Sequence, residues 1–342
     1  MSTPIEKSAE EATFECTVEQ LRALHLLKTS KRFLLTGHVR PDGDCVGAQA
    51  ALAACLDRMG SEVTILNPDP IEARYAYLSE HATFRAWEGE ALPAHDVVVF
   101  LDFNEITRCG RLGEAFADAK SKKLVIDHHI SMDEPWWDEA FVDVRASATG
   151  LLIHRIHEVI GLDIDLPAAL GIFTSIVSDT GWFKYSNTDA ETLRIASEMV
   201  EIGVEPAKLY QAIEQRKKLN HPELTGRVLA RTKFFADDRM ALVTQPWSED
   251  AVGYDSDDVL DCVRSVASVE VVLFVRELSD KTCKLSARSK EWYDVQRLTR
   301  RFGGGGHARA AGASFESSLK ETCADLVEAV EGDFAVRDGG AA

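Results

Sequence analysis

Residues 33–47 read Phe33-Leu-Leu-Thr-Gly-His-Val-Arg-Pro-Asp-Gly-Asp-Cys-Val-Gly47 and decide the fold of the first part of the chain. An apolar run ends at His38, a turn rich in metal-type ligands follows, and small residues then begin a helix. In open α/β sheets, sites form outside the carboxyl ends of strands, and Gly43 lets the backbone bend between Asp42 and Asp44. Two carboxylates placed in this way can serve two neighbouring cations. Alternatively, Asp44 simply caps the following helix.

The composition is that of an ordinary globular protein. The chain has 342 residues and is 45% apolar, which allows two domains. It lacks the ~20-residue apolar stretch that a membrane-spanning helix requires, and residues 1–16 are acidic without a signal pattern, so we expect a cytoplasmic location. Seven scattered cysteines without a C-x-x-C pair indicate reduced thiols. The net charge of −18 disfavours binding to long nucleic acid, because such binding rests on neutralising phosphates.

Strand-like and helix-like patterns alternate from residue 17 to about 205. This alternation predicts a doubly wound, mainly parallel α/β domain over residues 17–205. Residues 206–235 are expected to be a charged helical linker, and residues 236–335 a smaller α/β domain closed by a helix near 317–332. The expected strands are 32–37, 62–66, 97–101, 123–126, 241–244, 270–277, 282–288 and 312–315. The expected helices are 17–30, 45–59, 110–120, 147–160, 166–178, 189–202, 256–266 and 294–301, with residues 333–342 frayed.

Ligand-type side chains follow several of the expected elements in the first domain. They lie in four segments, which contain His38 with Asp42 and Asp44; Asp102; Asp127 with His128 and His129; and Asp179. Three of these segments follow buried strands, and parallel strands bring their carboxyl ends to one edge of a sheet. Each residue has an ordinary alternative, such as a capping aspartate or a hydrogen-bonded core histidine. One shared site explains the coincident positions better than several unrelated ones.

The donors are carboxylate and imidazole groups without cysteine, which favours Mn²⁺ or Mg²⁺ over thiolate-rich structural zinc. Five aspartates and three histidines exceed what one cation needs. Two cations about 3.5–4 Å apart would use them with one bridging aspartate, and such pairs clamp the oxygens of phosphoryl transfer and acidify a water. Cys45 directly follows Asp44 and would be open to oxidation beside a redox-active ion, although a small buried helix residue is the simpler interpretation.

The order and spacing of these residues form a recognisable pattern. It consists of Gly-His38-x-x-Pro41-Asp42-Gly-Asp44-x-x-Gly47, a strand ending in Asp102, Asp127-His128-His129, and Ser178-Asp179-Thr-Gly181. The pattern resembles that of the DHH phosphoesterases, whose namesake triplet is the third motif. The resemblance spans residues 18–335 and implies two Mn²⁺ ions, with Mg²⁺ as an alternative.

The resemblance also implies a role for each motif residue. Asp102 would bridge the two ions, Asp127 would orient a ligand imidazole, and His129 would contact and polarise the scissile phosphate. The implied ligands are His38, Asp42 and Asp102 for one ion, and Asp44, Asp102, His128 and Asp179 for the other. Asn187 lies where the family has a similar segment and is a candidate substrate contact, with simple turn formation as the alternative.

A glycine-rich segment with basic flanks marks the second half. Residues 281–309 contain eight Lys or Arg and two acidic residues, a local excess of six positive charges. Consecutive glycines let backbone N–H groups turn toward an anion, and arginine can grip a phosphate bidentately; a flexible loop and a solvated surface are the alternatives. The segments 284–289 and 302–312 resemble the DHH-associated C-terminal domain. That resemblance implies substrate contacts from Arg288, Ser289, Gly304, Gly305, Gly306, His307 and Arg309.

The compact two-domain form resembles the members of this family that degrade short oligoribonucleotides and remove the 3′-phosphate of 3′-phosphoadenosine 5′-phosphate (pAp). It implies a hydrolase that uses a water activated by two Mn²⁺ ions, with a small nucleotide or short RNA held partly by the second domain. Cyclic dinucleotides or their linear products are the alternative substrates. A nucleotide sensor without turnover is disfavoured, because every expected ligand is present. No membrane partner is expected, and the family analogy allows a homodimer.

Overall fold

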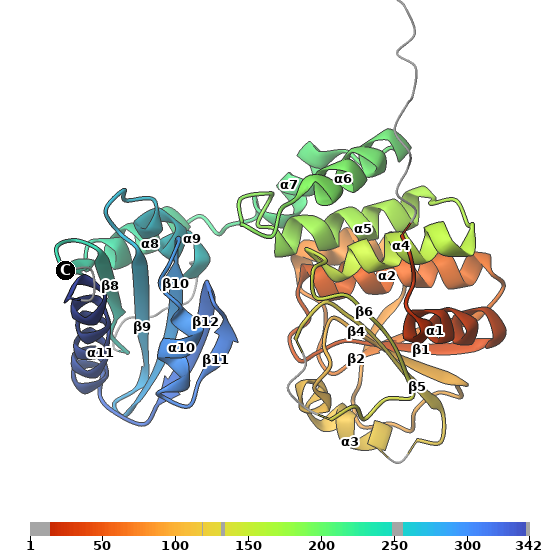
Figure 1. Cartoon of the computed structure of the whole chain (residues 1–342), viewed down its shortest axis with the longest axis horizontal. Coiled ribbons are helices and arrows are strands. Elements are labelled where there is room, and N and C mark those ends of the chain that lie inside the picture. The colour runs from red at the N-terminus through yellow and green to blue at the C-terminus, as the bar shows by residue number, and fades with distance from the viewer. Residues whose placement is uncertain (1–13, 118, 131–133, 248–255, 340–342) are drawn as a thin grey trace, which may run out of the picture. The chain divides into compact units, whose positions relative to one another are not determined.

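The structure, a computed structural model, describes residues 14–117, 119–130, 134–247 and 256–339 (Figure 1). Most of the acidic segment 1–16 therefore lies outside the described residues. The chain divides into two compact units, residues 1–216 and 217–342. Within the described part of the chain, every helix is too short or too polar to cross a bilayer.

The first unit is built on a six-stranded parallel sheet with the strand order β3-β2-β1-β4-β5-β6. The strands are β1 (Arg32–Thr36), β2 (Glu62–Asn67), β3 (Phe84–Ala86), β4 (Val97–Leu101), β5 (Lys122–Asp127) and β6 (Glu139–Val142). The strands β1, β4 and β5 lie in the middle of the sheet and carry the apolar runs seen in the sequence. The edge strands β3 and β6 have three and four residues, which is too short for the sequence pattern to predict them.

Helices cover both faces of this sheet, which confirms the doubly wound α/β class (Figure 1). They are α1 (Val18–Thr29), α2 (Gly43–Arg58), α3 (Arg111–Ala117), α4 (Thr149–Ile160), α5 (Leu166–Asp179), α6 (Ala190–Ile202) and α7 (Pro206–Ile213), with 3₁₀ segments η1 (Ala73–Glu80) and η2 (Ile106–Cys109). Val97, Val99 and Leu101 of β4 pack into the core formed with α2, α4 and α5. Val98 and Phe100 pack on the opposite face, into the core formed with α3. A strand covered on both sides in this way reads as a continuous apolar run.

The boundary between the units falls inside the predicted linker 206–235. Helix α7 buries Leu209 and Ile213 in the core of the first unit. Helix α8 (His221–Leu229) buries Val228 in a core of the second unit. The connecting segment is therefore shorter than predicted, because its charged helices belong to different units.

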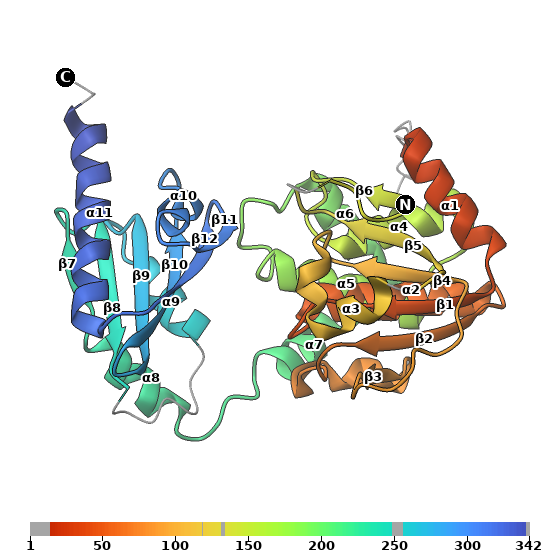
Figure 2. The same cartoon turned by 90° about the horizontal axis from the view of Figure 1, so that it is seen from below.

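The second unit contains a mixed sheet with the order β11-β12-β10-β9-β8-β7, in which only β8 and β9 pair in parallel. Its strands are β7 (Lys233–Phe235), β8 (Met240–Gln245), β9 (Val271–Ser279), β10 (Thr282–Ser289), β11 (Gly305–His307) and β12 (Ala310–Phe315). Its helices besides α8 are α9 (Ser256–Arg264), α10 (Val295–Arg300) and α11 (Leu319–Gly339). Figure 2 shows α11 lying along the sheet. The prediction of a frayed segment from 333 onward is wrong up to Gly339, because Phe334 is buried against Tyr293 and Trp292.

Candidate metal centre

The predicted ligand residues of the first unit meet at the carboxyl edge of its sheet. His38 follows β1, Asp102 follows β4, and His128 follows β5. Asp42 and Asp44 come from the start of α2, and Asp179 ends α5. The parallel strand order places the ends of β1, β4 and β5 side by side, which is why residues far apart in sequence converge here.

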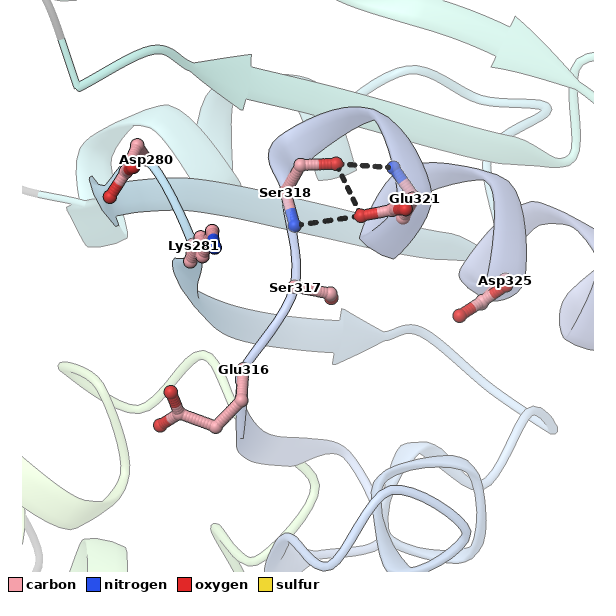
Figure 3. A pocket seen from close by; sticks show the side chains of 7 residues that line it. All are labelled: Asp280, Lys281, Glu316, Ser317, Ser318, Glu321 and Asp325. Carbon is pink, nitrogen blue, oxygen red and sulfur yellow. Dashed lines mark hydrogen bonds between the residues drawn. The ribbon is translucent and has the colours of Figure 1, made fainter.

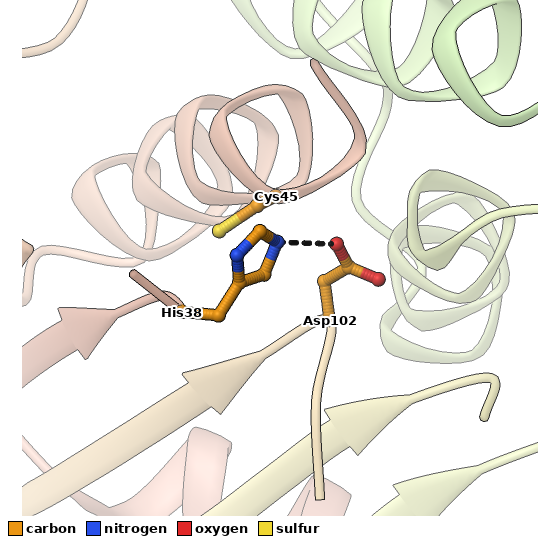
Figure 4. Close-up of side chains that lie close together, drawn as sticks. All are labelled: His38, Cys45 and Asp102. Carbon is orange, nitrogen blue, oxygen red and sulfur yellow. Dashed lines mark ion pairs between the residues drawn. The ribbon is translucent and has the colours of Figure 1, made fainter. Parts of the chain in front are cut away.

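Two histidines face a common group of carboxylates from different sides. His38 Nε2 lies 3.4 Å from Asp102 Oδ2 (Figure 4) and 3.8 Å from Asp42 Oδ2. His128 Nε2 lies 3.1 Å from Asp179 Oδ2, 3.3 Å from Asp44 Oδ2 and 3.6 Å from Asp102 Oδ1. Asp102 thus presents one carboxylate oxygen to each histidine. Its φ of 69° is a conformation that non-glycine residues rarely adopt and that is enriched at functional sites.

The second ring nitrogen of each histidine is held by the backbone. His38 Nδ1 lies 2.9 Å from Val39 O, and His128 Nδ1 lies 3.1 Å from Ala146 O. A carbonyl can only accept, so each Nδ1 carries the hydrogen, and in the neutral ring Nε2 keeps its lone pair. Both Nε2 atoms are buried and have no hydrogen-bond partner. Lone pairs and carboxylate oxygens that converge in this way fit a divalent cation, and the oxygen and imidazole donors suit Mn²⁺ or Mg²⁺.

The electrostatics show how much negative charge is concentrated at this edge. Burial and the charges of Asp44 and Asp42 raise the pKa of Asp102. Burial and the charge of Asp44 raise the pKa of Asp179 to about 7. Burial lowers the pKa of His38, but contacts with Asp102 and Asp42 outweigh it and raise this pKa to about 10. In the absence of a cation the cluster therefore binds protons, which a divalent ion would replace.

Asp127 organises the Asp-His-His loop. It is fully buried, and its Oδ1 accepts hydrogen bonds from His128 N (2.8 Å) and His129 Nδ1 (2.7 Å). Asn104 Nδ2 donates to His129 O (3.0 Å), and Trp136 Nε1 donates to Asn104 O (2.8 Å). Asn104 is a buried residue two positions after Asp102, and sequence reasoning missed it because a single asparagine in a turn carries no distinctive pattern.

Cys45 lies beside this cluster. Its Sγ and one ligand atom each of His38 and Asp102 all lie within 4.8 Å of one another, and Figure 4 shows the three side chains together. The side chain is completely buried, and burial together with the charges of Asp102 and Asp42 raises the pKa of its thiol well above the usual value. The structure thus agrees with the simpler interpretation, a small buried residue of α2, and a redox role stays a prediction.

The alternative interpretation of Asp44, as the cap of the following helix, is wrong. Asp42, rather than Asp44, caps α2, because its Oδ1 accepts from the N–H groups of Asp44 and Cys45 at 3.1 Å. Helix α4 begins after Ala148 without a cap from Ser147 or Thr149 side chains. The reason is that Asp44, from a different helix, accepts the Thr149 N–H.

Asn187 holds the loop that follows α5. Its Nδ2 donates to Ser147 O (3.0 Å) and to Asp179 O (3.1 Å). These bonds fix Asp179 relative to the segment before α4, which supports the turn interpretation of Asn187. Its contact with substrate stays a prediction.

The predicted substrate residues of the second unit gather around β10, β11 and β12. Arg288 of β10 and His307 of β11 both pair with Ala310 of β12, from its two sides. Gly305 of β11 pairs with Gly312 of β12. Gly305 and Gly306 lie in the edge strand β11, and the Gly304 N–H donates to Thr299 O, so anion binding by this run stays a prediction. Glycine is required at 304, where a Cβ would lie 2.2 Å from Gly312 O.

Three side chains of this group already have protein partners. Arg288 donates to Asp257 Oδ1 (2.8 Å), and Ser289 Oγ donates to Ala308 O (3.4 Å). Arg309 donates to Tyr293 O (2.8 Å) and to Glu291 O. Arg309 and Ser289 therefore shape the loop around β11, whatever else they bind.

A separate hollow in the second unit has a mainly acidic lining, and part of this lining caps a helix (Figure 3). It is lined by Asp280, Lys281, Glu316, Ser317, Ser318, Glu321 and Asp325. Ser318 N donates to Glu321 Oε2 (3.1 Å), and Glu321 N donates to Ser318 Oγ (3.3 Å). This reciprocal pair is the capping box that begins α11.

Comparison with known proteins identifies the family of both domains. Residues 32–202 match the DHH family, N-terminal domain, and residues 241–335 match the DHHA1 domain. The chain is 31% identical over 296 residues to the bifunctional oligoribonuclease and PAP phosphatase NrnA of Thermus thermophilus, covering 86% of this chain and 87% of that one. It is 26% identical over 309 residues to the protein of the same name from Bacillus subtilis, covering 87% and 93%. An exopolyphosphatase-related protein from Bacteroides fragilis shares the fold, with a TM-score of 0.85 at 24% identity over 93% of this chain and 97% of that one. With both domains matched in order and the motif residues gathered at one edge of the sheet, the chain belongs to the DHH family of phosphoesterases.

Proposed function

We propose that this protein is a Mn²⁺-dependent phosphoesterase that hydrolyses short oligoribonucleotides to mononucleotides and removes the 3′-phosphate of pAp. The observation that carries the proposal is the pair of buried Nε2 atoms of His38 and His128, which have no hydrogen-bond partner and face the two oxygens of Asp102. The names of the Thermus and Bacillus relatives supply the substrates.

The geometry supports two sets of cation ligands that share Asp102. Its Oδ2 faces His38 and its Oδ1 faces His128, so one carboxylate can serve both sides. Asp42 Oδ1 is used in capping α2, which leaves Oδ2 for the His38 side. The proposed sets are His38, Asp42 and Asp102 for one ion, and Asp44, Asp102, His128 and Asp179 for the other.

Two bound divalent cations would acidify a water and stabilise charge on the phosphoryl oxygens. The protein's own contribution to the charge at phosphorus comes from His129. Burial lowers the pKa of His129, but the hydrogen bond to Asp127 and the charge of Asp102 raise it above the ordinary value. The hydrogen bond between His129 Nδ1 and Asp127 fixes the ring, and the charge of a protonated His129 would stabilise a phosphoryl oxygen. Asp127 therefore acts by fixing the orientation of the ring.

The second unit is proposed to bind the part of the substrate that does not react. Residues 281–309 carry six net positive charges in a chain of net charge −18, so a phosphate is attracted locally although a long polyanion is repelled. Arg288 and His307 flank the same end of β12, where an exposed imidazole can hydrogen-bond or stack on a base. This combination favours a short substrate.

The test is hydrolysis with Mn²⁺ on three substrates side by side: pAp, a 5′-labelled RNA of a few nucleotides, and cyclic di-AMP. We expect phosphate from pAp and mononucleotides from the RNA. Asp102→Asn should abolish both activities, and Asp143→Asn, which changes a buried carboxylate that pairs with Arg155, should preserve them. Cleavage of cyclic di-AMP alone would refute the substrate assignment and indicate a signalling nucleotide. Absence of hydrolysis from all three, with Mn²⁺ shown to be bound, would refute the proposed function.

A further inference from the structure

Three helices of the first unit meet directly behind the candidate metal centre. A Cβ on Gly47 of α2 would lie 2.5 Å from Gly171 O and 2.7 Å from Ser175 N, both in α5. A Cβ on Gly150 of α4 would lie 2.3 Å from Ser175 Oγ. Only glycine allows these backbones to approach so closely. The junction places the hydroxyl of Ser175, which is completely buried, between α4 and the start of α2.

The Ser175 hydroxyl connects the N-terminus of α4 to Asp44. Gly150 N donates to Ser175 Oγ (2.6 Å), and Ser175 Oγ donates in turn to Asp44 Oδ1. Thr149 N donates to both oxygens of Asp44, at 3.0 and 2.9 Å. The first N–H groups of α4, which lack a side-chain cap of their own, therefore reach the Asp44 carboxylate directly and through Ser175.

These contacts give the two oxygens of Asp44 different tasks. Oδ1 accepts from Thr149 and Ser175, whereas Oδ2 accepts from Thr149 and faces His128 Nε2 at 3.3 Å. The side chain of Asp44 has no exposed surface, so water cannot substitute for a lost donor. The rotation of the carboxylate is consequently set by groups that are not themselves among the proposed ligands.

We propose that Ser175 is a positioning residue that fixes Asp44 so that its Oδ2 is directed at the cation shared with His128 and Asp179. This role rests on the metal centre of the proposed function and adds a residue to it. Residues that orient metal ligands typically contribute about 10–100-fold to metal affinity. Ser175 should therefore affect the ion on the Asp44 side and leave the ion on the His38 side unchanged.

Thr174 provides a matched control on the same helix. It is also completely buried, and its hydroxyl donates to Leu170 O (2.7 Å) and contacts Tyr77 Oη (2.6 Å), away from the carboxylate cluster. Ser175→Ala and Thr174→Val each remove one buried hydroxyl from adjacent positions of α5. A merely structural effect of losing a hydroxyl would be common to both variants, whereas an effect on Asp44 would appear only in the first.

The experiment is a calorimetric titration of the full-length, metal-free protein with MnCl₂, with free Mn²⁺ counted by electron paramagnetic resonance. We expect two ions for the wild type and for Thr174→Val. In Ser175→Ala one of the two should bind about 10–100-fold more weakly. Combined with His38→Gln, which leaves the Asp44-side ion, Ser175→Ala should weaken the ion that remains. Combined with Asp179→Asn, it should have no effect on the remaining ion.

Two outcomes would overturn the inference while leaving the proposed function in place. One is that Ser175→Ala binds both ions as tightly as the wild type does. The other is that Ser175→Ala and Thr174→Val weaken binding equally. Fewer than two ions in the wild type would instead refute the two-cation centre itself, and with it this role of Ser175.

Discussion

Asp102→Asn should abolish the increase in the free energy of unfolding that both cations give to the first unit. The reason is that the Asp102 carboxylate faces both His38 and His128. At Mn²⁺ concentrations 100-fold above the dissociation constant, each ion bound only by the folded state contributes about 2.7 kcal/mol to the free energy of unfolding. The first unit of the wild type should therefore gain about 5 kcal/mol, His38→Gln about half of that, and Asp102→Asn almost nothing. For a unit of 216 residues, about 5 kcal/mol corresponds to a rise of roughly 10–20 °C in melting temperature.

Without metal, Asp102→Asn should instead be more stable than the wild type. Burial and the charges of Asp44 and Asp42 raise the pKa of Asp102 in the folded state above that of the unfolded chain. A carboxyl group with a raised folded pKa stabilises the fold only at low pH, and this contribution is lost as pH rises through that pKa. An amide at position 102 never carries the charge. Asp102→Asn should accordingly melt at a higher temperature than the wild type in EDTA at neutral pH.

The assay is differential scanning calorimetry of the wild type and the variants in EDTA and in MnCl₂. The transition that moves with Mn²⁺ reports the first unit, since all proposed ligands lie there. Asp143→Asn is the control, because Asp143 is also buried beyond the end of a strand but pairs with Arg155. It should keep the full Mn²⁺ shift. If Asp102→Asn retained half of the wild-type shift, Asp102 would serve one ion only and the bridging assignment would be wrong.

Four further predictions concern the pH dependence of metal binding, two glycine positions and the second unit. Mn²⁺ affinity should fall as pH decreases, by up to about tenfold per pH unit for each proton released, because His38, with its pKa raised to about 10, and Asp179, with its pKa raised to about 7, must lose their protons before metal binds; equal affinity at pH 6 and 8 would contradict this. Gly171→Ala should destabilise the first unit by about 1–3 kcal/mol, because its Cβ would lie 2.5 Å from Gly47 O. Gly226→Ala, in an exposed helix position with open space, should instead stabilise the second unit by about 0.5–1 kcal/mol in urea unfolding. Arg288→Gln should raise KM for pAp and short RNA in initial-rate measurements while leaving the Mn²⁺-induced melting shift intact; an unchanged KM would remove Arg288 from the substrate contacts.

The sequence predicts most of the first unit because its central strands are unambiguous. Val97 to Leu101 is apolar at every position, which is typical of a strand covered on both faces. Once β1, β4 and β5 are parallel neighbours, the convergence of His38, Asp102 and His128 follows from topology. The edge strands carry no such signal. The charged helices at 206–213 and 221–229 resemble a linker in sequence. Only the structure shows that their few apolar residues pack into the cores of different units.

The contacts that refine the site could not be predicted from local patterns. Ser175 reaches Asp44 across 131 positions of sequence, and nothing near Ser175 distinguishes it from any other small residue of an apolar helix. The identity of the cap on α2 depends on the backbone angles at Asp42, which two aspartates around a glycine leave open. The glycine run at 303–306 is ambiguous for the same reason, since glycine permits a nest, a loop or a strand, and only the pairing with β12 shows that Gly305 and Gly306 join the edge of the sheet.

The first unit places helix N-termini against the carboxylates that a metal centre requires. Asp42 accepts the first N–H groups of α2, and Asp44 accepts those of α4 directly and through Ser175. Each of these termini carries partial positive charge, which stabilises a carboxylate whether or not a cation is bound. The Asp44 carboxyl shows the effect: burial raises its pKa, but His128, Ser175 and the Thr149 N–H outweigh burial and hold the pKa at about 2. Asp102 and Asp179 lie at no helix N-terminus and have raised pKa values, so their charges depend on a bound cation more than the charge of Asp44 does. The residue proposed to bridge the ions is therefore one of the two ligands whose charge the protein alone does not stabilise.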